Sequence, residues 1–367
     1  MVRVAGVFVF SRVVARLGCA VAPCLAWLIF IPALAGATSA QAEPIQGAGS
    51  TFAAPIITQW GRNYRAMRAD GGDFISPDWT VDYEPIGSLA GVLRLSQPDV
   101  DFAATDAPMP PDYLAKHGLK QFPVVIGGVA VAATLDGVPA GRLRLSGPTI
   151  ADIYLGKIRN WSDPALKALN PGITLPDLAI TVLHRKDGSG TTFVFADFLS
   201  QVSPEWKARL GADTLIAWPI GTGAEGSQGL VRALSTTRGA IAYVEFGQVA
   251  RAGLAFAEIQ NRDGAFVRPD ASSFQAAAAA VDWAGSKDFY RQLTNQPGLG
   301  AYPLTAATFA IVPASRSPAR ISRVHDVFRL AFDRGGSDAI ALGYVPLPPA
   351  LADQVKRYWA TASQPGG

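Results

Sequence analysis

The chain has 367 residues, of which 49% are hydrophobic, and carries 32 basic and 29 acidic side chains, for a formal net charge of +3. Arg3, Arg12 and Arg16 precede the first acid, Glu43, and without them the basic residues fall to 29 and equal the acids. A formally neutral protein has no electrostatic support for nonspecific binding to nucleic acid, so we expect no nucleic-acid partner.

The first 42 residues are typical of a cleaved signal peptide. The three arginines are followed by an apolar stretch at 17–35, and Ala40-Gln41-Ala42 supplies small residues at the positions that a signal peptidase reads. A membrane anchor is the alternative, because the apolar stretch could nearly span a bilayer. Pro23, Pro32 and the cleavage motif favour removal, so we expect an exported protein that begins at Glu43.

Both cysteines of the chain, Cys19 and Cys24, lie in this leader, and neither has a convincing lipoprotein context. The mature protein is therefore expected to contain no disulfide and no thiolate metal site.

The mature length suggests about two domains. Short apolar runs alternate with segments of helical periodicity, which predicts an α/β protein with a mostly parallel sheet. The predicted strands are 80–83, 100–104, 124–134, 180–183, 240–246 and 305–312. The predicted helices are 53–67, 92–95, 150–161, 191–202, 226–235, 274–283 and 319–332.

The glycine-rich segment 185–191 (RKDGSGT) lies between a predicted strand and a predicted helix. The start of a helix carries unpaired N–H donors and the positive end of the dipole. Arg185 adds a permanent cation, and Ser189 and Thr191 add hydroxyls, so the segment predicts a site for phosphate or a similar oxyanion. Two further small-residue turns, 47–52 (GAGSTF) and 86–91 (IGSLAG), also lead into predicted helices.

Each polar residue in these turns has a simpler structural interpretation. Thr51, Ser88, Ser189 and Thr191 could serve only as helix caps, but as a set beside the glycines they favour a ligand. Arg185 could form an ordinary ion pair with Asp187, yet a guanidinium held by a carboxylate still offers donors on another edge.

Asp106 follows a predicted buried strand, and it could simply brace the turn at Pro108. The alternative is that Asp106 accepts a hydrogen bond from a protonated ligand oxygen. Phosphate near neutral pH carries such a hydrogen and sulfate does not, so an acceptor at this point would favour phosphate and reject sulfate.

The sequence offers little support for an enzyme. His117, His184 and His325 show no metal-ligand spacing, and neither a G-x-S-x-G nor a G-x-x-x-x-G-K-[ST] motif is present. We therefore expect no catalytic residue, no metal and no cofactor.

Several ordered segments resemble the periplasmic phosphate-binding proteins of bacterial phosphate ABC transporters. They are 47–55 (GAGSTFAAP), 101–108 (DFAATDAP), 121–128 (QFPVVIGG), 152–158 (DIYLGKI), 185–195 (RKDGSGTTFVF), 218–221 (WPIG), 239–245 (GAIAYVE) and 293–296 (LTNQ). The resemblance implies a two-lobe periplasmic-binding-protein fold, with a two-crossover hinge and the ligand cleft between the lobes. It places the first lobe at 43–124 plus 304–361 and the second lobe at 125–303. The Gly/Pro-rich end of the sequence separately predicts a flexible tail at 362–367.

The resemblance also implies a site and partners. The ligand would be inorganic phosphate, the partners would be the permease subunits of an ABC transporter, and the protein would be a periplasmic monomer. Asp187 would position Arg185. The phosphate-binding residues would be Thr51, Phe52 through its backbone N–H, Ser88, Asp106, Arg185, Ser189, Gly190 through its backbone, and Thr191.

The chain departs from the family pattern at two places. Leu89 and Ala90 stand where the family commonly has serine and glycine, which puts one hydrogen bond in doubt, and 70–77 looks like an extra loop. Two other functions remain open, a receptor of the same fold for another oxyanion such as molybdate or sulfate, and a secreted phosphatase that uses the same cleft.

Overall fold

The structure is a computed structural model that describes residues 43–69 and 80–362. The predicted signal peptide, the predicted extra loop at 70–77 and the tail after residue 362 lie outside the described residues. None of the described helices is long and apolar enough to cross a membrane.

An eight-stranded sheet runs through the protein in the order β2-β1-β3-β11-β4-β8-β6-β7. Its strands are β1 (Ile45–Gly49), β2 (Val81–Glu84), β3 (Phe102–Thr105), β4 (Leu119–Ala133), β6 (Thr181–Arg185), β7 (Thr222–Ala224), β8 (Ala240–Glu245) and β11 (Thr305–Pro313). A second, three-stranded sheet has the order β10-β9-β5, with strands β5 (Arg144–Leu145), β9 (Glu258–Gln260) and β10 (Phe266–Val267).

The large sheet is mixed, whereas the sequence predicted a mostly parallel one. Its two outer groups, β2-β1-β3 and β8-β6-β7, are parallel. In the middle, β11 is antiparallel to β3 and β4, and β4 is antiparallel to β8. The chain passes from one outer group to the other along β4 and returns along β11, so these two strands must run in opposite directions.

The central strand β4 begins at Leu119, five residues before the predicted start at residue 124. The prediction stops short of Pro123 because proline cannot donate to a ladder. In the structure Pro123 pairs with Phe309 and Val125 with Thr308, which leaves Val124 as an extra residue in a bulge. A bulge is one of the few positions within a sheet that accommodate proline.

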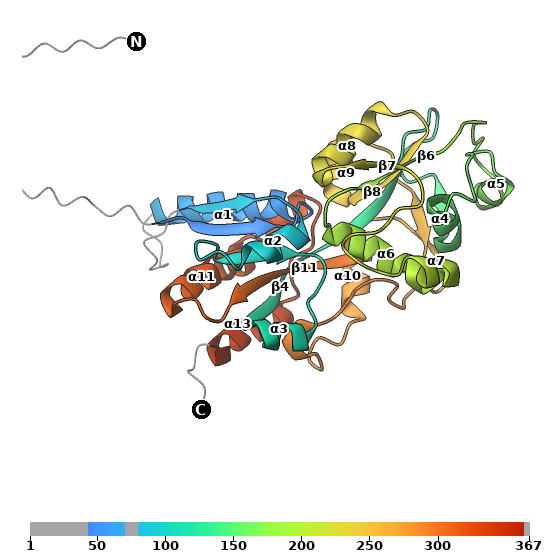
Figure 1. Cartoon of the computed structure of the whole chain (residues 1–367). Coiled ribbons are helices and arrows are strands. Elements are labelled where there is room, and N and C mark those ends of the chain that lie inside the picture. The colour runs from blue at the N-terminus through green and yellow to red at the C-terminus, as the bar shows by residue number, and fades with distance from the viewer. Residues whose placement is uncertain (1–42, 70–79, 363–367) are drawn as a thin grey trace, which may run out of the picture. The chain divides into compact units, whose positions relative to one another are not determined.

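The described helices are α1 (Ala54–Ala69), α2 (Ser88–Arg94), α3 (Pro111–His117), α4 (Gly147–Tyr154), α5 (Pro164–Leu169), α6 (Gly190–Val202), α7 (Pro204–Arg209), α8 (Gly226–Thr236), α9 (Phe246–Arg251), α10 (Ala271–Ala279), the short η1 (Lys287–Phe289), α11 (Pro318–Arg334), α12 (Gly336–Ala341) and α13 (Pro349–Ala362). Helices α1, α2, α11 and α13 lie on one side of the β4–β11 pair, and α4 to α9 lie on the other (Figure 1).

Two helices end sooner than predicted. The segment 150–161 was predicted as one helix, but α4 ends at Tyr154, because Gly156 adopts a left-handed φ of 78° and turns the chain. The helix predicted at 274–283 corresponds to α10, which begins at Ala271 and ends at Ala279.

Each outer group of strands packs against its own aromatic cluster. Beside β3, the Phe328 ring of α11 contacts Phe102 and Phe122 with centroid separations of 5.4 and 5.7 Å. Beside β8, Tyr243 stacks on Phe195 of α6 at 4.3 Å. Such edge and stacked contacts stabilise aromatic cores beyond the area they bury, so both groups offer rigid supports for the turns between them.

Candidate anion site

The candidate site lies where turns from both outer groups of the sheet meet. In a parallel sheet, loops at the carboxyl ends of strands lead into helix N-termini and commonly form ligand sites. Four such segments contribute here, the turn from β1 to α1, the start of α2, the residue after β3, and the turn from β6 to α6. The structure brings together the residues that the sequence singled out in all four segments.

Asp106 follows β3 and is only 3% exposed. It does not brace the Pro108 turn through its side chain; it accepts a hydrogen bond from Thr308 at 2.7 Å and from Ser50 at 2.8 Å. Burial raises the pKa of Asp106 to about 6, while these two hydroxyls and the charge of Arg185 pull the pKa the other way. Near neutral pH the group is therefore a mostly ionised carboxylate held among neutral donors.

Arg185 ends β6, and its side chain is 1% exposed. Its Nε donates to Asp187 Oδ1 at 2.7 Å and its Nη2 donates to Asp187 Oδ2, so the guanidinium is held along one edge. Burial alone would raise the pKa of Asp187, but the hydrogen bonds and charge of Arg185 outweigh burial and lower it. The other edge of the guanidinium, which includes Nη1, lies toward Ser227 at 3.4 Å.

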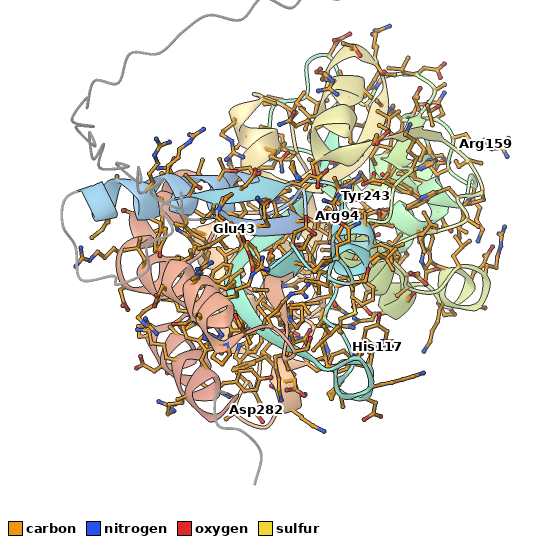
Figure 2. All side chains as sticks on the ribbon, turned by 60° about the vertical axis from the view of Figure 1, so that its left-hand side comes forward. Glu43, Arg94, His117, Arg159, Tyr243 and Asp282 are labelled. Atoms are coloured by element: carbon orange, nitrogen blue, oxygen red, sulfur yellow. The ribbon has the colours of Figure 1, made fainter. Side chains whose placement is uncertain are left out.

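The backbone of Arg185 is also fixed. Its N–H donates to the Tyr243 hydroxyl at 3.1 Å, and that hydroxyl is 2.8 Å from Thr192 Oγ1 in the first turn of α6. Tyr243 is fully buried and lies within the packed interior, whereas Arg159 and Asp282 lie at the periphery (Figure 2). Tyr243 thus ties the end of β6 to the start of α6, the two ends of the glycine-rich turn.

The start of α6 combines a structural cap with free donors. Ser189 is the N-cap residue and accepts a hydrogen bond from the Thr192 N–H at 3.2 Å, so the simpler interpretation holds for this side chain. The next two N–H groups, of Gly190 and Thr191, have no partner within the helix because of their position. The Thr191 hydroxyl is buried without a hydrogen-bond partner among the described residues. An unsatisfied buried hydroxyl costs about 1–3 kcal/mol, a cost that a ligand oxygen at this position would offset.

Gly190 is a point of close approach between the two outer groups. A β-carbon on Gly190 would lie 2.5 Å from Ser88 Oγ and 2.7 Å from Asp106 Oδ2. Ser88 Oγ in turn accepts a long hydrogen bond of 3.4 Å from the Asp106 N–H. Any side chain at residue 190 would therefore separate Ser88 and Asp106 from the α6 donors.

Leu89, one of the departures from the family pattern, lies at this junction. Its N–H donates to the Gly188 carbonyl at 3.2 Å, and its side chain covers the Gly188 backbone so closely that a β-carbon there would lie 2.5 Å from Leu89 Cβ. Leu89 therefore reaches across the junction as an apolar cover, in addition to its backbone hydrogen bond.

The turn after β1 supplies Thr51 and Phe52. The Phe52 ring is fully buried, its carbonyl accepts from the Tyr344 hydroxyl at 2.6 Å, and its N–H finds no acceptor among the residues that the structure describes. Thr51 Oγ1 is 2.8 Å from Ser227 Oγ at the start of α8. The turn is thus anchored through one carbonyl and leaves a backbone donor available.

Sequence reasoning missed four residues that hold these groups in place: Ser50, Thr308, Ser227 and Tyr243. Ser50 stands beside Thr51 in the first glycine-containing turn, and Tyr243 lies in a strand that was predicted without any role for this hydroxyl. Thr308 and Ser227 lie 202 and 176 residues from their partners, and no local pattern points to them.

Comparison with known proteins identifies the family. The PBP superfamily domain matches residues 35–323 of the chain. The phosphate-binding protein PstS of Xylella fastidiosa is 41% identical over 318 residues, which cover 86% of this chain and 85% of that protein. PstS of Pasteurella multocida is 40% identical over 326 residues, covering 89% and 92%. The chain belongs to the periplasmic-binding-protein superfamily and, within it, to the family of PstS phosphate-binding proteins.

Solved structures agree on the two-lobe fold. A high-affinity periplasmic phosphate-binding protein solved with bound phosphate superposes with a TM-score of 0.67 at 20% identity, covering 86% of this chain and 93% of that one. A phosphate-binding protein from Stenotrophomonas maltophilia superposes with a TM-score of 0.61 at 19% identity, covering 86% and 94%. At these identities the likeness establishes the fold alone.

Proposed function

We propose that the protein binds inorganic phosphate in the periplasm and delivers it to the permease of an ABC transporter for import. The main support for the proposal is that one buried carboxylate lies beside Gly190 in a site otherwise rich in hydrogen-bond donors. Asp106 is the acceptor, and the donors come from Arg185 and the start of α6. The PstS relatives, which are named for phosphate binding, support the same ligand.

Phosphate fits this combination because it is both an acceptor and a donor near neutral pH. Its bare oxygens accept from Arg185, from the N–H groups of Phe52, Gly190 and Thr191, and from hydroxyls. Its own hydrogen is donated to Asp106. A fully deprotonated anion would instead place an oxygen lone pair against the carboxylate, a mismatch that is relieved only when Asp106 itself takes up a proton.

The proposed phosphate-binding set is Thr51, Phe52, Ser88, Asp106, Arg185, Ser189, Gly190 and Thr191, with Asp187 holding Arg185. Ser189 would contribute through its hydroxyl while it also caps α6. We propose lobes at 43–124 plus 304–361 and at 125–303, which close on the ligand by a hinge motion. The passes along β4 and β11 are the proposed hinge crossings.

We further propose that the leader is cleaved, that the mature protein is a periplasmic monomer, and that it binds its ligand without chemical turnover. Cells expressing the full chain should yield, in their periplasmic extract, a protein whose N-terminal residue is Glu43. Recovery of the uncleaved chain in the membrane fraction would instead indicate an anchor. The purified protein should release no phosphate from a phosphomonoester; turnover that depends on Ser189 would overturn the binding-only function.

The test of the ligand is a calorimetric titration of that periplasmic protein with phosphate and, separately, with sulfate and molybdate. Phosphate should bind with a Kd of about 1 μM or below, near −8 kcal/mol or stronger, while the other two should bind at least about 100-fold more weakly at pH 8. Equal affinity for sulfate would contradict the role of Asp106. Binding that survives Arg185→Ala with little change would show that the site lies elsewhere.

A further inference from the structure

Ser227 lies in the first turn of α8 and is 2% exposed, although no sequence pattern selects it. We propose that Ser227 is a positioning residue for the ligand, which orients the Thr51 hydroxyl so that Thr51 donates its hydrogen to the bound anion. The inference rests on the proposed function, because it assigns a role within the same site. It concerns a group that acts through Thr51, with no contact of its own to the ligand.

Arg185, Ser227 and Thr51 form a short chain of hydrogen bonds. A serine hydroxyl has one hydrogen to donate and two lone pairs, whereas an arginine can only donate. Arg185 Nη1 lies 3.4 Å from Ser227 Oγ, so it occupies one lone pair of that oxygen. Either hydroxyl could donate in the 2.8 Å contact between Ser227 and Thr51, and the proposal assigns the hydrogen to Ser227, with Thr51 Oγ1 as the acceptor. The Thr51 hydrogen is left for a third partner.

The direction of this chain of hydrogen bonds follows from charge. Donation from a guanidinium polarises the hydroxyl that accepts it and makes that hydroxyl a better donor to its neighbour. The chain from Arg185 through Ser227 to Thr51 therefore ends in a hydrogen that is best received by an anion. In the reverse direction Thr51 would use its hydrogen on Ser227, and the anion would lose that donor.

The start of α8 is held firmly enough for this role. The Gly226 N–H donates to Asp187 Oδ1 at 3.1 Å, and the same carboxylate oxygen accepts from Arg185 Nε at 2.7 Å. Asp187 thus connects Arg185 and the residue before Ser227 into one unit. Thr51 belongs to the other outer group of the sheet, after β1, so its contact with Ser227 forms across the junction between the two groups.

A neighbouring cavity shows which side of the pair faces outward. It has a volume of about 570 Å³ and lies between α1 and α8. Thr51 and Ser227 both line it, together with the exposed Arg62 and Arg232, whereas Asp106 and Arg185 do not. The Thr51–Ser227 pair therefore borders an outer cavity that Asp106 and Arg185 do not line. A Thr51 hydroxyl without a fixed orientation could turn toward water in that cavity.

The first experiment compares Ser227→Ala with Ser235→Ala, a matched control at an exposed serine on the same helix. Ser227→Ala should weaken phosphate binding by about ten-fold, the effect of losing one buried hydrogen bond that supports a charged contact. Ser235→Ala should bind as the parent does. Ser227→Gly removes the same hydroxyl together with the β-carbon, and it must give at least the same loss.

The second experiment distinguishes positioning from direct contact. Thr51→Val removes the hydroxyl through which Ser227 acts, so adding Ser227→Ala to it should change the phosphate Kd by less than about two-fold. If the double variant instead lost affinity by the product of the two single-variant losses, Ser227 would contact the anion directly or act elsewhere, and the inference would be overturned. Equal melting temperatures of all variants without phosphate should accompany the expected result. If the parent itself bound no phosphate, the proposed function would fail before this question arose.

Discussion

Replacing Asp106 by asparagine changes the one acceptor of the site and preserves its shape. The amide oxygen of the new side chain can still accept from Thr308 and Ser50, which now donate at 2.7 and 2.9 Å to Asp106 Oδ1, so the fold should persist. The amide nitrogen replaces the oxygen that lies next to Gly190 and brings a permanent donor. We expect the Asp106→Asn protein to bind sulfate measurably and to bind phosphate about ten-fold more weakly, since the phosphate hydrogen loses its acceptor.

The magnitude follows from the pKa of Asp106, which burial raises to about 6. Sulfate brings no hydrogen, so it can bind beside Asp106 only when that carboxyl is protonated. One pKa unit corresponds to about 1.4 kcal/mol, so protonation costs about 2.7 kcal/mol at pH 8 and about 1.4 kcal/mol at pH 7. The affinity of the parent for sulfate should therefore rise by nearly ten-fold for each pH unit lowered from 8, and level off below pH 6.

The assay is competition by sulfate against labelled phosphate between pH 5 and pH 8. The parent should show a sulfate Kd that falls by roughly 50- to 100-fold from pH 8 to pH 6, whereas Asp106→Asn should show a sulfate Kd that does not depend on pH. A sulfate Kd of the parent that does not change with pH would refute the proposal that Asp106 selects a ligand able to donate a hydrogen to it. Rejection of sulfate by Asp106→Asn would refute it as well.

Three further predictions concern charge, closure and stability. Arg185→Lys should weaken phosphate binding by about 100-fold, because a lysine cannot hold Asp187 along one edge and donate from the other, while Arg238→Lys at an exposed ion pair should change nothing. Gly188→Ala should weaken phosphate binding at least about ten-fold in the same titration, because the added β-carbon would lie 2.5 Å from Leu89 Cβ, and Leu89→Gly in the same chain should restore affinity by removing that clash. Burial raises the pKa of Glu245 to about 7 against the opposing effect of Arg251, so the folded state holds a proton that the unfolded chain has lost. Denaturation at pH 5 and pH 8 should show a free energy of unfolding lower by up to about 3 kcal/mol at pH 8, and Glu245→Gln should remove most of that difference.

The parts of the fold that sequence could predict are those that depend on local pattern. Buried strands such as β8 and amphipathic helices such as α11 have a periodicity that tertiary contacts reinforce. The start of β4 was mispredicted because the acceptability of Pro123 depends on a bulge opposite β11, about 185 residues away. The central antiparallel pairs were missed for the same reason, since strand direction is a property of the chain path and not of the residues in a strand.

The candidate site divides in the same way. The role of the β6–α6 turn could be predicted from the sequence, because Arg185, Asp187 and the cap Ser189 are close in sequence and Arg185 and Asp187 bond to each other directly. The hydrogen-bond partners of Asp106 could not be predicted from the sequence, because Thr308 lies in a strand 202 residues further along the chain. The residues that contact a ligand are therefore easier to predict from a sequence than the residues that fix the protonation and orientation of those contacting groups.

The charges of the site explain why neutral donors must carry much of the attraction for an anion. The guanidinium of Arg185 is balanced by Asp187, and the carboxylate of Asp106 adds a further negative charge, so the three ionisable groups sum to −1 when all are ionised. Net positive charge therefore cannot be what holds the anion. The favourable field must come from oriented N–H groups at the start of α6, from the N–H of Phe52 and from hydroxyls such as that of Thr51, whose dipoles act at short range in a buried site. Because dipoles attract only when they point correctly, residues that fix their direction determine affinity as much as the donors themselves.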